Sequence, residues 1–232
     1  MNAADPQSAA SLEIKTRRIG RYLVFTFLSL FLLTTIGFAG IVFSSDVPEV
    51  SSRLIGHPRQ RFPLTVYFEP PPSKDLDAAV QDAIAQWNQI FDQLFHVDAF
   101  KRTDTKSRSD ILMRFTKSAP GEMGATDVDA DKSGIIRLPV KIELNPPKAR
   151  GHTNTRQMLF DVVAHELGHA VGLPHSNKVS SIMCCERGSI NFKDPAIRAA
   201  YIEARQHPDL YSVAPELAAH YQKFWHEHPS AS

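Results

Sequence analysis

A predominantly apolar run from Tyr22 to Phe43, interrupted only by Thr26, Ser29, Thr34, Thr35 and two glycines, separates two stretches of mixed polar and apolar sequence. It contains no charged side chain, and about 22 helical residues at about 1.5 Å each span roughly 33 Å, against a hydrocarbon core of about 30 Å. Basic residues precede the run and acidic residues follow it, so the positive-inside rule keeps residues 1–21 in the cytoplasm. We therefore expect residues 22–43 to form one transmembrane helix that leaves the rest of the chain extracytoplasmic.

Two other interpretations of this run are less favoured. A cleaved signal peptide is one, because Gly37-Phe38-Ala39 places small residues at a cleavage position, and it would leave the domain secreted or periplasmic. The long leader, and a run longer than the usual signal core of about 7–15 residues, favour an uncleaved anchor. A buried core helix is the other, but a helix this long and apolar on every side needs a far larger protein around it.

The part that follows the run divides into a linker and a domain. Residues 44–61 are rich in Ser, Pro, Arg and Gly, which predicts a linker before a domain at 62–232. Leu64–Phe68 has the composition of a strand, and the prolines at 70–72 end it. A helix follows, with apolar residues at the 3–4 spacing of one buried face, and Trp87 is expected in the core. These positions are Leu76, Val80, Ala83, Ile84, Trp87, Ile90, Phe91 and Leu94.

More strands and helices are predicted further along. Residues 110–115 and 135–144 indicate two strands, the second from its alternation of apolar and polar positions. A second long helix is expected to begin near Asn154, which can cap it while Gln157 reaches back. Two short amphipathic helices are predicted at 196–205 and 215–225. This order of elements predicts an α+β domain.

Charge and cysteine usage narrow the class of protein. With 26 basic and 25 acidic side chains, a net charge of +1 and no basic stripe, a nucleic-acid partner is not expected. The two cysteines, Cys184 and Cys185, are adjacent and form no disulfide framework. They can form a strained vicinal bridge, pair with another chain, or stay reduced and buried.

Two histidines and a glutamate share the second predicted helix. His165 and His169 are four residues apart, which places both imidazoles on one helix face, one turn apart, where they can bind one ion. The side chain of Glu166 points in a different direction around the helix from the side chains of the two histidines. It is therefore suited to hold and deprotonate a metal-bound water rather than to act as a third ligand.

A third ligand requires the helix to end and the chain to turn back. Gly172 can end the helix in the left-handed conformation, and Pro174 prevents its continuation, so His175 can return toward the metal. Three histidines and a water complete the tetrahedral arrangement of catalytic zinc. Six isolated histidines are instead expected at the surface or in the core with satisfied hydrogen bonds. They are His57, His96, His207, His220, His226 and His228.

The whole pattern resembles a known group of zinc peptidases. His165-Glu-x-x-His169-x-x-Gly172-x-x-His175, followed by Ser181-Ile-Met183, is similar to the zinc signature and Met-turn of metzincins. The resemblance implies a bound Zn²⁺ with Met183 as a hydrophobic floor beneath it.

Within the metzincins the chain resembles matrixins, particularly short bacterial-type ones, from about residue 62 to residue 183. The resemblance implies a metzincin-like catalytic domain with a twisted mixed sheet, an active-site helix and a smaller C-terminal helical subdomain. It also implies that Met123–Thr126 is an edge strand along which an extended peptide aligns. The weaker shared patterns are Phe62-Pro-Leu-Thr-Val, Ala83-Ile-Ala-Gln-Trp87, Ser109-Asp-Ile-Leu and Asp161-Val-Val-Ala-His165.

Three features depart from the family pattern. No cysteine lies between the apolar run and the zinc motif, so the inhibitory cysteine switch is absent. Cys185 stands where astacin-like and serralysin-like members have a tyrosine. Asp127-Val-Asp-Ala-Asp131 resembles a calcium loop, but Lys132 stands where an EF-hand needs glycine, which leaves bound Ca²⁺ and a solvated acidic turn as alternatives.

These observations predict a zinc-dependent endopeptidase that acts on a peptide or protein substrate. His165, His169 and His175 are its expected metal ligands, with Glu166 as general base. A membrane-tethered binding or scaffold protein that keeps a structural zinc is one alternative, and it would add a fourth protein ligand. A non-proteolytic zinc hydrolase that uses the same water is the other.

Overall fold

The computed structural model describes residues 54–70, 74–116, 123–145, 155–185 and 188–229. The transmembrane helix predicted at 22–43 lies outside these ranges, as do residues 1–21. No helix in the described part of the chain combines the length and apolarity that a bilayer crossing requires.

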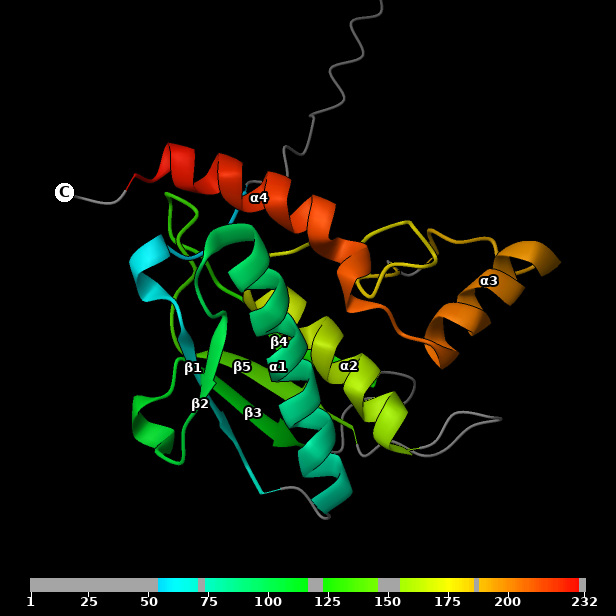
Figure 1. The fold of residues 1–232 in the computed structure, drawn as a ribbon, viewed down its shortest axis with the longest axis horizontal. Coiled ribbons are helices and arrows are strands. Elements are labelled where there is room, and N and C mark those ends of the chain that lie inside the picture. The colour runs from blue at the N-terminus through cyan, green and yellow to red at the C-terminus, as the bar shows by residue number, and fades with distance from the viewer. Residues whose placement is uncertain (1–53, 71–73, 117–122, 146–154, 186–187, 230–232) are drawn as a thin grey trace, which may run out of the picture. The chain divides into compact units, whose positions relative to one another are not determined.

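A five-stranded mixed sheet forms one layer of the domain, in the order β2-β1-β3-β5-β4 (Figure 1). Neighbouring strands are parallel except that β4 pairs antiparallel with β5, and β4 forms one edge of the sheet. The predicted strands at 64–68 and 110–115 are confirmed. The strands are β1 (Leu64–Phe68), β2 (Phe100–Arg102), β3 (Ile111–Phe115), β4 (Gly124–Asp127) and β5 (Val140–Leu144).

The strand predicted at 135–144 is wrong in its first half. Only residues 140–144 join the ladder, whereas Ile135 bridges Gly56 and Ile136 bridges Ala130. Pro139 has no N–H group to donate into a ladder, so the regular pairing begins after it. Periodicity alone does not reveal this change of partner.

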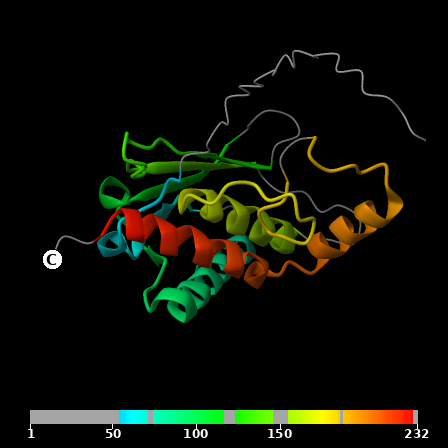
Figure 2. The ribbon, with the colours of Figure 1, turned by 90° about the horizontal axis from the view of Figure 1, so that it is seen from above.

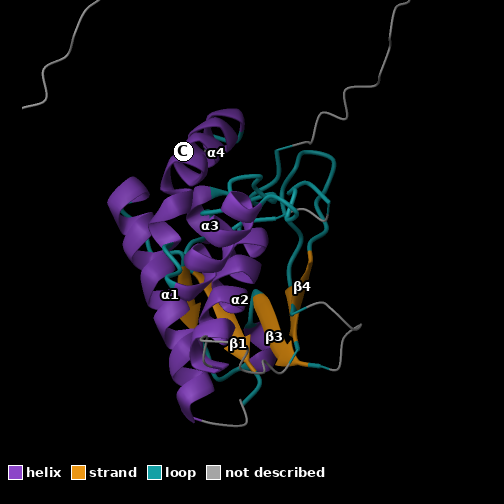
Figure 3. Ribbon diagram, turned by 90° about the vertical axis from the view of Figure 1, so that its right-hand side faces the viewer, coloured by secondary structure: helices purple, strands orange, loops and turns teal. Residues whose placement is uncertain are grey.

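Two long helices, α1 (Lys74–Phe95) and α2 (Thr155–Ala170), cover the same face of the sheet (Figures 2 and 3). The C-terminal helices differ in how they pack. Helix α4 (Ala214–Glu227) contributes buried apolar side chains to the main core. Helix α3 (Pro195–Gln206) has no buried residue and extends away from the sheet (Figure 1). The mixed α/β fold with a helix carrying the histidine motif is thus confirmed.

Trp87 joins the two long helices. Its side chain is fully buried, and its indole Nε1–H donates to the carbonyl oxygen of Ala164 at 3.0 Å. The predicted core position of Trp87 is therefore confirmed. Because Ala164 directly precedes His165, this bond also fixes the rotation of α2 at the point where the motif begins.

Helix α2 ends at Ala170, and Gly172 caps it in the left-handed conformation, as predicted. Gly172 has φ +89°, its N–H donates to His169 at 2.8 Å, and the N–H of Leu173 donates to Gly168 at 3.0 Å. These are the two hydrogen bonds of a Schellman cap. A Cβ atom at position 172 would lie 2.2 Å from the carbonyl oxygen of Ile55, so only glycine allows this approach.

The last part of the predicted linker, residues 54–61, lies against the domain. His57 is fully buried, and its Nε2–H donates to the carbonyl oxygen of Ala170 at 2.9 Å. The indole N–H of Trp225 in α4 donates to the carbonyl oxygen of His57 at 2.9 Å. This segment therefore connects the end of α2 to α4.

Replacing Gly172 with alanine should destabilise the domain more than replacing Gly188. Both glycines have positive φ, at +89° and +83°, but a Cβ at Gly188 meets nothing within 4 Å. We expect Gly172→Ala to lower the free energy of unfolding by at least about 1 kcal/mol more than Gly188→Ala, because it adds a clash with Ile55 to the backbone strain. Urea denaturation measures this difference, and equal losses would contradict the described contact.

His57 should make the domain less stable in mild acid. Burial lowers the pKa of His57 from 6.5 to about 4. Above pH 6.5 the imidazole is neutral in both states; as the pH falls toward 4, the unfolded chain binds a proton that the folded protein does not bind. Between pH 7 and pH 5 this difference costs about 2 kcal/mol of unfolding free energy.

The matched variant is His57→Gln, which keeps a donor for the Ala170 carbonyl but does not titrate. Urea denaturation at pH 7 and pH 5 should show a smaller acid-induced loss for His57→Gln than for the unaltered chain. The same loss in both proteins would rule out His57 as a source of the acid sensitivity.

Candidate metal centre

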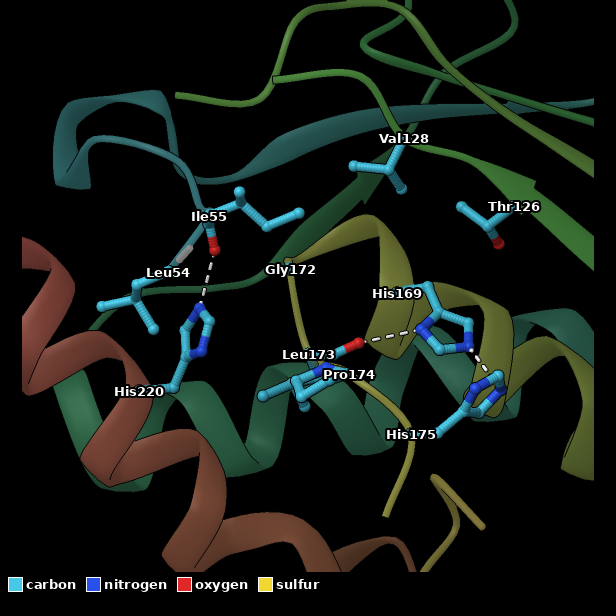
Figure 4. A pocket seen from close by; sticks show the side chains of 10 residues that line it. All are labelled: Leu54, Ile55, Thr126, Val128, His169, Gly172, Leu173, Pro174, His175 and His220. Carbon is cyan, nitrogen blue, oxygen red and sulfur yellow. Dashed lines mark hydrogen bonds between the residues drawn. The ribbon is translucent and has the colours of Figure 1, made fainter. Parts of the chain in front are cut away.

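The imidazole rings of three histidines meet beside the C-terminal half of α2. The Nε2 atom of His169 lies 3.1 Å from Nε2 of His165. It lies 3.2 Å from Nε2 of His175 (Figure 4). His165 and His169 come from successive turns of α2, and His175 comes from the chain that turns back after Gly172. The structure thus brings together the three ligands that the sequence predicts.

Backbone carbonyl groups set the tautomer of two of these imidazoles. Nδ1–H of His165 donates to Ile182 at 2.8 Å, and Nδ1–H of His169 donates to Leu173 at 2.8 Å. In a neutral imidazole the other nitrogen then carries a lone pair. Burial lowers the pKa of His165 to about 3 and also lowers the pKa of His169, so both rings are neutral near pH 7.

This donor set fits a zinc ion. Tetrahedral zinc with Zn–N bonds of about 2.0–2.1 Å separates its nitrogen ligands by about 3.3 Å. The two measured Nε2 separations, 3.1 and 3.2 Å, are close to that value. Among the described residues, these three histidines form the one group of His, Cys, Asp or Glu side chains suited to hold a metal. Three protein ligands leave a fourth position for water, as in catalytic rather than structural sites.

Glu166 lies buried between the metal centre and the edge strand β4. Its Oε2 atom accepts a hydrogen bond from the hydroxyl of Thr126 at 2.6 Å. A Cβ atom on Gly124 would lie 2.5 Å from Oε1 of Glu166, so glycine in β4 makes room for the carboxylate. The edge strand therefore both accommodates and orients this side chain.

Met183 lies under α2. A Cβ atom on Gly168 would be 2.3 Å from its sulfur, so the glycine allows the methionine to pack directly beneath the helix. The N–H of Ser176 donates to the carbonyl oxygen of Met183 at 2.9 Å, which holds the residue after His175 to the same turn. Met183 therefore packs against α2 at Gly168, the residue before His169.

A buried ion pair supports the turn before Met183. Arg205 of α3 contacts both carboxylate oxygens of Asp161 at 3.1 and 3.2 Å and donates to the carbonyl oxygen of Ser181 at 2.6 Å. Since Ile182 follows Ser181 and accepts the bond from His165, Arg205 helps to position a metal ligand from outside the motif. Sequence reasoning missed this pair, because its two members are 44 residues apart.

The two cysteines and the acidic loop also have defined positions. Cys184 and Cys185 are joined as a vicinal disulfide, one of the three alternatives that the sequence leaves open. In the acidic loop, Oδ1 of Asp131 accepts bonds from the N–H and hydroxyl of Ser133, and Asp129 pairs with Arg137 at 3.0 Å. These carboxylates form no metal cluster among the described residues.

Sequence comparison assigns this chain to a known family. The matrixin family model matches residues 61–194, which is more than half of the chain. Macrophage metalloelastase from Oryctolagus cuniculus is 31% identical over 130 residues, covering 51% of this chain and 25% of that protein, so the chain spans about a quarter of the relative's length. Archaemetzincin from Methanopyrus kandleri aligns with a TM-score of 0.40 and 14% identity, covering 69% of this chain and 94% of that one. The match to the family model shows that the chain belongs to the matrixins, a family of metzincins.

Proposed function

We propose that this chain is a zinc-dependent endopeptidase that hydrolyses peptide bonds, with Glu166 as its general base. The observation that carries the proposal is the convergence of three histidine Nε2 atoms beside the buried carboxylate of Glu166. Family membership supports it, because the matched segment contains the whole constellation. The three-histidine donor set favours this function over a scaffold with a closed structural zinc.

The residues of the site have distinct tasks in this reaction. His165, His169 and His175 would hold the zinc ion, which would act as a Lewis acid toward the scissile carbonyl and would lower the pKa of the attacking water. Glu166 accepts the proton of that water and passes it to the leaving amine. Thr126 holds Oε2 of Glu166, so the carboxylate is oriented before the substrate binds.

Strand β4 provides a place for the substrate backbone. It is the last strand of the sheet, and its outer edge has no strand partner among the described residues. An extended peptide can add to such an edge through main-chain hydrogen bonds. Because β4 contacts Glu166 through Gly124 and Thr126, a peptide bound there passes directly in front of the metal ligands.

Glu166→Ala should lose catalysis and keep the metal. We expect kcat/KM for peptide cleavage to fall by at least about 100-fold, the usual contribution of a general base, while one zinc ion per chain remains. Peptide-library cleavage and metal analysis of the purified full chain measure the two quantities. Glu203→Ala is the matched control, because Glu203 is an exposed glutamate on α3, with 71% of its side chain accessible. Near-full activity in Glu166→Ala would refute its role as base.

We also propose that residues 22–43 anchor the domain to a membrane, with residues 62–232 on the extracytoplasmic side. The charge-free apolar run and the basic residues before it support this topology. The mature protein should remain in the membrane fraction after an alkaline carbonate wash and should retain its original N-terminus. A soluble product whose N-terminus follows Ala39 would instead identify a cleaved signal peptide.

A further inference from the structure

A cavity of about 460 Å³ opens beside His169 and His175, whereas Glu166 lines a different cavity. Figure 4 shows Ile55 and Val128 on one side of it and Leu173, Pro174 and His175 on the other. Leu54 completes the wall next to Ile55. The cavity therefore adjoins the position where the scissile bond must lie.

The walls of this cavity are mostly apolar, and its polar groups are engaged elsewhere. Nε2–H of His220 donates to the carbonyl oxygen of Ile55 at 2.8 Å, and Nδ1–H of His169 donates to Leu173 (Figure 4). The hydroxyl of Thr126 is directed to Glu166. A substrate side chain that enters the cavity thus meets aliphatic surface, and burial of an apolar group there is favourable.

The wall formed by Leu54 and Ile55 is held firmly in place. Gly56 accepts a bond from Ile136 at 2.9 Å and donates to Gly134 at 3.0 Å. His57 follows, fully buried and bonded to the end of α2. Residues 54 and 55, like His220, lie outside the segment that matches the matrixin family model.

The position of Glu166 indicates which half of the substrate reaches the cavity. Glu166 and His165 line a different cavity of about 200 Å³, together with Gly124 at the start of β4. Because Glu166 delivers a proton to the leaving amine, the C-terminal half of the substrate lies toward that smaller cavity. The larger cavity, which adjoins His175 and Val128, then receives the acyl half, and the peptide runs antiparallel to β4.

The two cavities differ in chemistry. The smaller one is lined by Asp161 and Arg205, whose ion pair makes its surface polar. An apolar side chain placed there would desolvate part of this pair without replacing its contacts with water. The larger cavity, with its mostly aliphatic walls, is therefore the better site for a large apolar side chain.

We propose that the cavity bounded by Leu54, Ile55 and Val128 binds a large apolar side chain on the acyl side of the scissile bond, and that Leu54 determines this preference. This inference rests on the proposed peptidase function and specifies its substrate class. One methylene more or less in an apolar pocket changes kcat/KM by roughly 10- to 200-fold, so a change of Leu54 is large enough to detect.

The test compares substrate preference in the zinc-loaded full chain and its variants, using a peptide library randomised on both sides of the cleavage site. The unaltered chain should prefer Leu or Phe over Lys by at least about tenfold at one acyl-side position. Leu54→Asp should lose this preference and increase relative cleavage of peptides with Lys there, because it places a carboxylate in the wall. Ile202→Asp is the control, since Ile202 is exposed on α3 and lines neither cavity, and its preference should be unchanged.

Leu54→Ala keeps the test decisive if Leu54→Asp does not fold, and it should weaken the apolar preference at the same position. Cleavage without any acyl-side apolar preference, or with the same preference in the Leu54 variants, would overturn the inference and leave the peptidase function intact. Failure of the zinc-loaded chain to cleave any peptide would overturn both.

Discussion

The Nε2 atoms of His165 and His169 lie 3.1 Å apart, and the hydrogen bonds of their Nδ1 atoms leave a lone pair on each of them. Two lone pairs at this distance repel unless a cation lies between them. Protonation does not relieve the contact near pH 7, since burial lowers the pKa of both rings. The two nitrogens are placed to share one metal ion, and their spacing depends on the rigidity with which the fold holds both rings.

That rigidity comes from contacts made at each end of the motif. Trp87 bonds to the carbonyl group just before His165, and the cap at Gly172 directs the chain toward His175. Beneath the helix, Gly168 lets Met183 approach closely. Residues 54–57 lie against the C-terminal end of α2, where His57 bonds to Ala170, and they are joined to α4 by the hydrogen bond from Trp225 to His57. The metal site thus depends on both ends of the described domain as well as on the motif.

The local features of this site could be predicted from sequence because each depends on a few neighbouring residues. The spacing of His165 and His169 follows from the helical repeat, and the helix end follows from Gly172 and Pro174. Composition and periodicity also predict strands β1 and β3 and the buried face of α1.

Features that depend on tertiary contacts could not be predicted in this way. Strand β2 is only three residues long, so it has no periodic pattern that would predict it. Its first residue, Phe100, is held by the side chain of Asn88, which bonds to both the N–H and the carbonyl group of Phe100. The contact of Thr126 with Glu166 joins residues 40 positions apart. Residues 54 and 55 fall within the predicted linker, because the Ser-, Pro- and Arg-rich composition of residues 44–61 says nothing of the hydrogen bonds that hold this segment beside the metal site.

The central claim is that three histidines hold a catalytic zinc with one open position. X-ray absorption at the zinc edge, measured on the zinc-loaded full chain, tests it most directly. The account predicts one zinc per chain with three imidazole nitrogens and one oxygen at about 2.0–2.1 Å. A sulfur ligand near about 2.3 Å, a fourth protein nitrogen, or the absence of stoichiometric zinc would contradict it.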